Sequence, residues 1–386
     1  MVCQAARAPA PCGPHCNGIY PSKSHWMPEV MWAWVDFPIR ATGRSVINKM
    51  EQQLKRAMLI AAWVFLLTAT ATEVEQSAAS AAEPIPFSVG EASPANTYLA
   101  IWMAEEAGLY AAQGLTLNTV PMVGGRESAP ALEAGTIQLM HIGMSSVVRA
   151  NAGGSDLRLI GSLSNIIRQT MFLAPGVDGA EDLRGGIIGI SSAGSESDST
   201  TTLALEQLGL RRDDVTIEEI GRERFEAVQS GAVSATMLGE PYRSEALAAG
   251  LNPIVDLYAD RIPWLFSGLT VDRAYLRSNR EVILRFMRAT VEGNYFAVSD
   301  EVRAKAVLAR ELGLSDPEII DASYNNFKAE TPINAEIDRA GAENIMAALA
   351  GRGASNNVED YIDMSIGEEL RAEGFYAAMQ EKYRVP

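Results

Sequence analysis

The sequence predicts an α/β protein of two similar lobes, each built from alternating strands and helices. Short apolar runs rich in β-branched residues alternate with stretches in which apolar residues recur at helical spacing. This alternation begins near Phe87 and starts again at Met171, so two sets of βα units of similar length follow one another. The chain from Glu83 onwards is long enough for one large or two medium domains.

The first set supplies strands and helices in strict alternation. Strands are expected at residues 87–90, 115–121, 137–142 and 157–163. Helices are expected at residues 97–107, between Gly124 and Gly135, and at residues 145–152. Gly108 and Gly135 directly follow the first two helical patterns and are expected to end those helices.

The second set continues the pattern and is followed by a helical remainder. Strands are expected at residues 171–173, 186–190, 215–220, 235–237 and 253–256. Helices are expected at residues 197–208, 225–230 and 240–249. From Asn279 onwards, amphipathic stretches at residues 280–299, 300–312, 316–327 and 335–350 predict a mainly helical end.

An export signal is predicted inside the chain rather than at its start. Lys55 and Arg56 form a short positive region, and residues 57–67 form an apolar core. Small residues suited to signal peptidase follow at Ala69, Ala71, Ser80 and Ala82. The apolar core is shorter than the roughly 20 residues of a membrane span, which makes a transmembrane anchor the weaker alternative. We therefore expect residues 50–82 to be a cleaved signal peptide and the mature protein to be periplasmic.

The segment before Met50 is interpreted as a mis-called N-terminal extension. Residues 1–49 show neither a helical nor a strand period. All three cysteines of the chain, Cys3, Cys12 and Cys16, lie in this segment. The mature protein would therefore depend on core burial rather than on disulfides, and no cysteine is available near the cleavage region for a lipid anchor.

Charge and histidine content exclude several classes of function. The chain has 32 basic and 48 acidic residues, of which 7 and 5 lie in the first 82, leaving 25 and 43 and a net charge of −18. Nucleic acid is therefore not an expected partner. His141 is the one histidine after residue 82. A single histidine is too few for a multi-histidine metal site and makes histidine catalysis an unfavoured expectation. No cofactor is expected.

Three segments in order resemble the periplasmic substrate-binding proteins of ATP-driven importers, in the nitrate, taurine, alkanesulfonate and thiamine-pyrimidine group. Residues 100–143 contain a helix ending in Gly-Leu-Tyr, a following strand, a paired glycine and an Ala-Leu-x-x-Gly helix. Residues 181–215 and 227–250 are similar to the second half of that family. Each segment alone is weak, but the three in order are specific, and the resemblance covers nearly all of residues 87–375.

The resemblance implies the fold of a type II periplasmic binding protein, with two lobes joined by two crossovers and a ligand cleft between them. Lobe 1 would take residues 83–169 and 267–386, and lobe 2 residues 170–266. The crossovers would fall near residues 168–171 and 264–269. Closure of such lobes on a ligand is a hinge motion.

Cleft residues are expected in the loops that follow the strands, where backbone amides and helix N-termini face the crevice. Arg126 follows two glycines and has the fork geometry that suits a carboxylate, sulfonate or phosphate. The serines of residues 191–200 are suited to an anionic oxygen, whereas Glu196 and Asp198 oppose an anion there and favour an amine or ring nitrogen. The candidate ligand-binding residues are Ser93, Asn96, Thr97, Arg126, Ser145, Ser146, Ser192, Ser195, Ser197, Glu240 and Tyr242.

The candidates can also be explained by structural roles that need no ligand. Ser93, Asn96 or Ser145 would cap the helix that follows it, and Glu240 beside a helix start would be favourable without any ligand. In the resembled family, an acidic or polar residue before the proline that corresponds to Pro241 lies near the cleft, which implies a hydrogen-bonding role for Glu240. Tyr242 or Trp264 would stack on a flat ligand. Trp102 and Phe172 are expected in the core, and His141 is expected to be an interior residue. Arg168 would bridge the lobes or contact ligand, and the sequence leaves both readings open.

The function that the sequence predicts is solute binding without chemistry. The protein would capture a small organic molecule, a sulfonate, a carboxylate or a nitrogen heterocycle, and deliver it to the permease and ATPase subunits of an ABC importer as a monomer. Some proteins of this fold are enzymes that make a thiamine pyrimidine with a cysteine-rich segment, which the mature chain lacks. A ligand-sensing lobe for a membrane receptor is the other alternative. The identity of the ligand stays open at this point.

Overall fold

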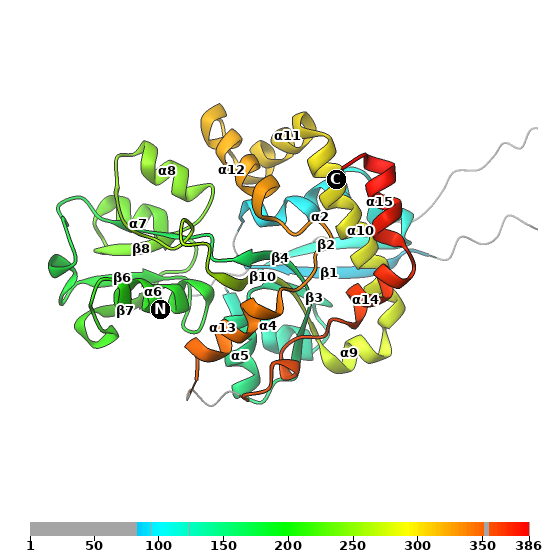
Figure 1. Cartoon of the computed structure of the whole chain (residues 1–386), viewed down its shortest axis with the longest axis horizontal. Coiled ribbons are helices and arrows are strands. Elements are labelled where there is room, and N and C mark those ends of the chain that lie inside the picture. Colours follow the sequence, from blue (N-terminus) through cyan, green and yellow to red (C-terminus); the bar gives the residue numbers. More distant parts are fainter. Residues whose placement is uncertain (1–82, 93, 123, 351–354, 386) are drawn as a thin grey trace, which may run out of the picture. The chain divides into compact units, whose positions relative to one another are not determined.

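A computed structural model describes residues 83–92, 94–122, 124–350 and 355–385. The chain divides into two units, Met1–Ala81 and Ala82–Pro386, and the described residues, coloured in Figure 1, all belong to the second. The predicted extension, its three cysteines and the predicted signal peptide lie outside the described residues. Within the described residues, no helix is long and apolar enough to cross a bilayer.

The first sheet has the strand order β2-β1-β3-β10-β4. Its strands are β1 (Ile85–Glu91), β2 (Leu115–Pro121), β3 (Leu139–Ile142), β4 (Leu157–Ile166) and β10 (Pro263–Asp272). β1 pairs in parallel with β2 and β3, whereas β10 runs antiparallel to both β3 and β4. The carboxyl ends of β1, β2 and β3 therefore meet at one edge of this sheet.

The second sheet has the strand order β7-β6-β8-β5-β9. Its strands are β5 (Thr170–Leu173), β6 (Ile187–Ile190), β7 (Thr216–Glu219), β8 (Ala235–Leu238) and β9 (Asn252–Asp256). β6 pairs in parallel with β7 and β8, and β5 is antiparallel to β8 and β9. Each lobe thus contains a parallel core with an antiparallel strand that comes from, or leads to, the other lobe.

The helices of lobe 1 come from both ends of the chain. They are α2 (Leu99–Glu106), α3 (Leu109–Ala112), α4 (Gly124–Glu133), α5 (Met144–Ala152), α9 (Arg273–Ser278), α10 (Arg280–Ser299), α11 (Glu301–Leu312), α12 (Pro317–Glu330), α13 (Arg339–Ala348), α14 (Ser365–Ala372) and α15 (Phe375–Tyr383), with 3-10 turns η1 (Asn96–Tyr98) and η4 (Val358–Asp360). The long amphipathic helix α10 anchors the core, because Phe286 stacks on Phe87 of β1 at 4.8 Å and on Tyr110 at 5.3 Å between ring centroids.

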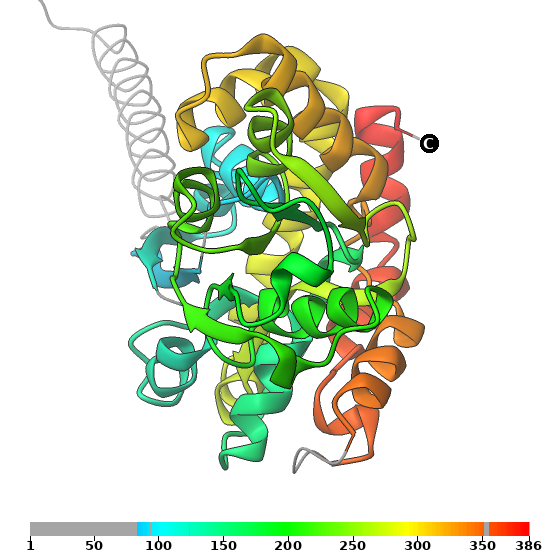
Figure 2. The same ribbon diagram turned by 90° about the vertical axis from the view of Figure 1, so that its left-hand side faces the viewer.

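Lobe 2 is smaller and is formed by a continuous part of the chain. Its helices are α6 (Glu196–Gln207), α7 (Arg224–Ser230) and α8 (Tyr242–Ala248), with 3-10 turns η2 (Glu181–Leu183) and η3 (Arg212–Asp214). Figure 2 shows these elements, in green, in front of the rest of the protein. Phe172 is fully buried in this lobe, and Trp102 is buried in lobe 1, as predicted for both.

Two connections join the lobes. The first lies between Ile166, at the end of β4, and Thr170, at the start of β5; the second lies between Asp256 and Pro263. The sequence placed the second crossover near residues 264–269, which lie within β10, a strand that pairs with β3 and β4 of the first sheet. The strand β10 and the helices α9, α14 and α15 had no counterpart among the predicted elements.

Candidate ligand-binding site

A cavity of about 160 Å³ lies between the two sheets and is lined by residues from both lobes. Its walls are the loops that follow β1, β3, β6, β7 and β8, together with the first crossover and part of β10. Carboxyl ends of parallel strands carry exposed amides and helix N-termini, which is why binding crevices of open α/β sheets form there. The cavity is therefore the candidate binding site.

Several of the sequence-predicted residues meet at this cavity. Those that line it are Asn96, Thr97, Ser146, Ser195, Ser197, Glu240 and Tyr242. Ser145 and Ser192 are buried nearby but do not line the cavity. Ser93 lies outside the described residues, and for Arg126 only the backbone, in α4, is described. Contact of any of these residues with a ligand stays a prediction.

The serine-rich loop before α6 is held together largely by its own hydrogen bonds. Ser195 is the N-cap of α6 and accepts a hydrogen bond from the amide of Asp198. Ser197 Oγ accepts a hydrogen bond from the amide of Ser191 at 2.9 Å. Asp198 accepts from Gly194 N at 2.7 Å and pairs with Arg212 at 2.5 Å, so its charge is already compensated inside lobe 2. The loop is thus preformed, and capping accounts for much of its serine content.

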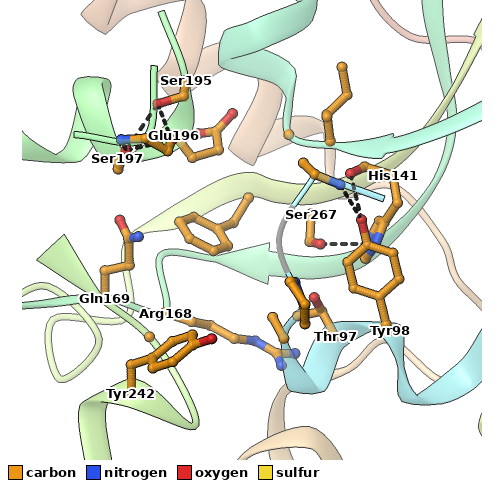
Figure 3. A pocket seen from close by; sticks show the side chains of 18 of the residues that line it. Thr97, Tyr98, His141, Arg168, Gln169, Ser195, Glu196, Ser197, Tyr242 and Ser267 are labelled. Carbon is orange, nitrogen blue, oxygen red and sulfur yellow. Dashed lines mark hydrogen bonds between the residues drawn. The ribbon is translucent and has the colours of Figure 1, made fainter. Parts of the chain in front are cut away.

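Glu196 was expected to oppose an anion in the site, but its carboxyl group is engaged by hydrogen bonds within the protein. Its Oε1 accepts a hydrogen bond from Ser145 N at 2.7 Å, and its Oε2 accepts from Ser145 Oγ at 2.8 Å and Trp264 Nε1 at 2.6 Å. Burial raises the pKa of Glu196 to about 7, although these hydrogen bonds favour the carboxylate. Figure 3 shows this residue beside Ser195 and Ser197 on one side of the cavity.

His141 and Tyr98 form the opposite side (Figure 3). The Tyr98 hydroxyl accepts from Ala92 N at 3.0 Å and donates to the His141 carbonyl at 3.2 Å, and the two rings meet edge to face at 4.0 Å. His141 Nε2 lies 2.6 Å from Ser267 Oγ. Burial, assisted by the charge of Arg168, lowers the pKa of His141 to about 3, so the imidazole is neutral at physiological pH. His141 is therefore interior, as predicted, and also lines the cavity.

Three arginines line the cavity, and of these only Arg168 was considered as a ligand contact from the sequence. Arg168 lies in the first crossover, donates to Thr331 Oγ1 at 3.1 Å and to the Leu163 carbonyl at 3.3 Å, and is buried. Arg222 and Arg224 follow β7 from lobe 2. The rule that selected the other loops, the carboxyl end of a strand, also applies to β7 and would have found both.

These guanidinium groups bring positive charge to the wall of the cavity, and the Glu330 carboxylate offsets that of Arg168 only in part. Burial lowers the pKa of Arg168 and of Arg224 to about 10, so both stay protonated at neutral pH. The Nε atoms of both are buried without a hydrogen-bond partner among the described residues. Within that same part of the chain, none of the three arginines forms an ion pair, in contrast to Arg243 and Arg261 nearby.

Glu240 and Tyr242 close the cavity from lobe 2. Glu240 precedes a cis peptide bond to Pro241 and accepts a hydrogen bond from Ser244 N at 3.3 Å, while Arg243 lies 3.6 Å from its carboxylate. Burial raises the pKa of Glu240, against the effect of Ser244 and Arg243. The Tyr242 ring packs near Phe225 with 6.1 Å between centroids. With Tyr98 and Phe266, Tyr242 gives the cavity aromatic walls beside its charged groups.

Gly143 offers a test of how tightly this site is packed. A Cβ at this position would overlap Glu196 Oε1 and the Phe266 carbonyl. Gly143→Ala is therefore expected to lower the free energy of unfolding by about 2 kcal/mol, because the Phe266 carbonyl is part of the backbone and cannot rotate away as a side chain would. Chemical denaturation measures this loss, and Gly179→Ala, where nothing lies within 4 Å, is the control. Equal stability of the two variants would contradict the packing described here.

The arrangement offers polar, charged and aromatic groups that suit the binding of a small molecule. Its histidine is neutral and hydrogen-bonded, and its carboxylates are held by other donors. Among the described residues, no group of three or more histidine, cysteine, aspartate or glutamate side chains is placed to hold a metal ion. What the site offers is a small cavity with several guanidinium groups, hydroxyl donors and aromatic walls.

Comparison with known proteins identifies a family and several similar proteins. A family profile described as NMT1/THI5 like matches residues 96–304. A protein of Escherichia coli (strain K12), provisionally named an aliphatic sulfonates-binding protein, is 27% identical over 228 residues, which cover 57% of this chain and 70% of that protein. The riboflavin-binding protein RibY of Chloroflexus aurantiacus is 31% identical over 115 residues, 29% of this chain and 32% of that protein.

Solved structures agree at the level of the fold. The periplasmic aliphatic sulphonate binding protein SsuA from Escherichia coli superposes with a TM-score of 0.55 and 24% identity, covering 70% of this chain and 93% of that chain. The periplasmic nitrate-binding protein NrtA from Synechocystis PCC 6803 gives a TM-score of 0.58 and 13% identity over 77% of this chain and 91% of that chain. The two-lobed architecture described above is therefore that of a periplasmic binding protein.

Proposed function

Because the chain belongs to the NMT1/THI5-like family, we propose that it is an exported solute-binding protein that captures a small organic anion and delivers it to an ABC importer. The observation that carries this proposal is the convergence of Arg168, Arg222 and Arg224 on one cavity without ion-pair partners among the described residues. A buried cation without an opposite charge is costly, and an anionic ligand would supply that charge.

The charge of the cavity favours an anion over a cation. The two carboxyl groups that line it, Glu196 and Glu240, are engaged by Ser145, Trp264 and Ser244, and burial raises the pKa of each. A guanidinium group matches the planar or tetrahedral oxygens of a carboxylate or sulfonate better than an ammonium group does. The acid group of the ligand would therefore lie near the arginines.

The remainder of the ligand would occupy the aromatic part of the cavity. Tyr98, Tyr242 and Phe266 line it and offer apolar contact or stacking. Thr97, Ser146 and Ser195 add hydroxyl groups that hydrogen-bond a polar substituent. This combination suits a short organic sulfonate or carboxylate better than an inorganic ion, because an inorganic ion would leave the aromatic walls unused.

A nitrogen heterocycle is the second candidate ligand. Tyr242 and Phe266 present flat apolar faces, and Glu240 at the same cavity is an acceptor for an amine or a ring N–H. A relative that matches part of this chain is named as a riboflavin-binding protein. In this reading the arginines would pair with a phosphate or carboxylate substituent of the heterocycle rather than with a sulfonate.

Thermal unfolding of the purified protein against a ligand panel tests the proposal. The panel contains short alkanesulfonates, carboxylates, nitrate, pyrimidines and riboflavin. A ligand at 100 times its dissociation constant adds about 2.7 kcal/mol to the free energy of unfolding, which raises the melting temperature measurably. A shift with sulfonates or carboxylates supports the anion, and a shift with pyrimidines or riboflavin alone supports the heterocycle. If no member shifts the transition and calorimetry detects no binding, the proposal fails.

A further inference from the structure

Two side chains of lobe 2 that line the cavity, among the described residues, hydrogen-bond directly to lobe 1. The first is Arg222, which follows β7. Its Nε donates to the Ala92 carbonyl at 3.0 Å, and its Nη2 donates to the carbonyls of Glu91 at 2.8 Å and Met122 at 3.1 Å. These carbonyls stand at the carboxyl ends of β1 and β2, so one guanidinium group holds the ends of two neighbouring strands.

The second side chain is Glu196, the first residue of α6. Its carboxyl group accepts three hydrogen bonds from lobe 1, two from Ser145 at the start of α5 and one from Trp264 at the start of β10. Ser145 N belongs to the first turn of a helix, where amides have no intrahelical partner and favour a negative charge. Gly143 makes the approach possible, because a side chain there would overlap the Glu196 carboxyl.

The two contacts lie at different places along the edge of the first sheet. Arg222 contacts the ends of β1 and β2, whereas Glu196 contacts the elements that follow β3 and begin β10. In the strand order β2-β1-β3-β10-β4, these positions are neighbouring but separate. A rotation of one lobe against the other would break both contacts together, although they share no atom.

We propose that Arg222 and Glu196 are positioning residues, and that their hydrogen bonds to lobe 1 form a two-point clasp that holds the lobes closed. The clasp sets ligand affinity indirectly, because these hydrogen bonds join the two lobes and do not involve the ligand. The clasp is a property of the protein itself, and its test does not depend on knowing the ligand. Because both contacts depend on the same lobe rotation, loss of one is expected to weaken the other at a distance.

The indole N–H of Trp264 is a direct probe of the clasp. An N–H that donates to a carboxylate resonates downfield of a free one in a proton–nitrogen correlation spectrum of the purified protein. Trp264→Phe identifies the signal. Glu196→Ala is expected to move this signal upfield, since its acceptor is gone. Arg222→Ala is expected to move it in the same direction, although Arg222 contacts neither Trp264 nor Glu196 in the structure.

A local role for Arg222 would not move the Trp264 signal, which separates the two explanations. Arg184→Ala is the matched control, because Arg184 is an arginine of lobe 2 whose ion pairs with Glu181 and Asp214 stay within that lobe. Small-angle X-ray scattering gives the second readout: the radius of gyration is expected to rise in Arg222→Ala and in Glu196→Ala but not in the control. If Glu196→Ala does not fold, Arg222→Ala carries the test alone.

Ligand affinity provides the third readout. With any ligand found by the panel above, each single variant is expected to raise the dissociation constant at least 10-fold, and the double variant less than the product of the two. An unchanged Trp264 signal together with an unchanged radius of gyration in Arg222→Ala overturns the clasp, whatever the panel shows. Failure of the panel alone would instead count against the proposed function, because the first two readouts need no ligand.

Discussion

Arg224→Met is expected to raise the dissociation constant for a short alkanesulfonate or carboxylate by about 100-fold. Arg224 lines the cavity, and its Nε is buried without a partner among the described residues. Its Nη1 donates a hydrogen bond to the Gly221 carbonyl at 2.5 Å, within its own loop. Removing one member of a buried charge pair costs roughly 2 to 5 kcal/mol of binding free energy, and 100-fold is about 2.7 kcal/mol.

Isothermal titration calorimetry of the purified protein measures this effect. Arg224→Lys is expected to be intermediate, because it keeps the charge but loses the fork geometry. Arg277→Met, at an exposed arginine of α9, is the control that removes the same group away from the cavity. The folded state itself is not expected to lose stability in Arg224→Met, because the variant removes an unpaired buried charge. Binding equal to that of the Arg277 control would contradict an anion site at Arg224.

Glu196 is expected to make the protein less stable as the pH rises. Its pKa is about 7 in the folded protein and 4.5 in its unperturbed state, and burial is the main cause of the difference. A carboxyl group whose pKa is raised on folding contributes stability that is complete below pH 4.5 and is lost as the pH rises through about 7. Between pH 5 and pH 8 this contribution amounts to about 2 to 3 kcal/mol.

Urea denaturation at pH 5 and pH 8 checks this prediction. The drop in the free energy of unfolding between the two values is expected to be about 2 to 3 kcal/mol larger in the wild type than in Glu196→Gln, which does not titrate. Glu318→Gln, at an exposed position of α12, is expected to leave the drop unchanged. Glu240, whose pKa burial also raises, contributes in the same direction and remains in both proteins, so the difference isolates Glu196. A drop of equal size in wild type and Glu196→Gln would show that Glu196 is ionised in the folded protein at pH 5.

Most strands and helices could be predicted because their apolar periods are strong and glycines mark their ends. The predicted helix at residues 280–299 coincides with α10, and the predicted strand at 115–121 coincides with β2. The strand β10 could not be recognised in the same way. Its ten residues are buried on both sides over most of its length, so they show no alternation, and its partners are distant in sequence. The family resemblance and the periplasmic binding protein fold that it implied are confirmed.

The candidate site could be predicted in part. The rule on loops after strands brought residues such as Thr97, Ser195 and Tyr242 to the cavity. Arg222 and Arg224 were missed although the same rule applies to the loop after β7, because arginines that follow an exposed edge strand resemble solvated surface charge. Likewise, Glu196 looked like an obstacle to anion binding, since a sequence alone does not show that its carboxyl group is turned towards Ser145 and Trp264.

The position of β10 in the first sheet has a consequence for how the chain folds. β10 lies between β3 and β4, yet all of lobe 2 separates it from β4 along the sequence. The sheet of lobe 1 therefore stays split until residues 263–272 have been synthesised and docked, whereas lobe 2 needs no later part of the chain for its own sheet. Contacts so distant in sequence close slowly. A chain emerging from the ribosome would accordingly complete the sheet of lobe 2 before that of lobe 1.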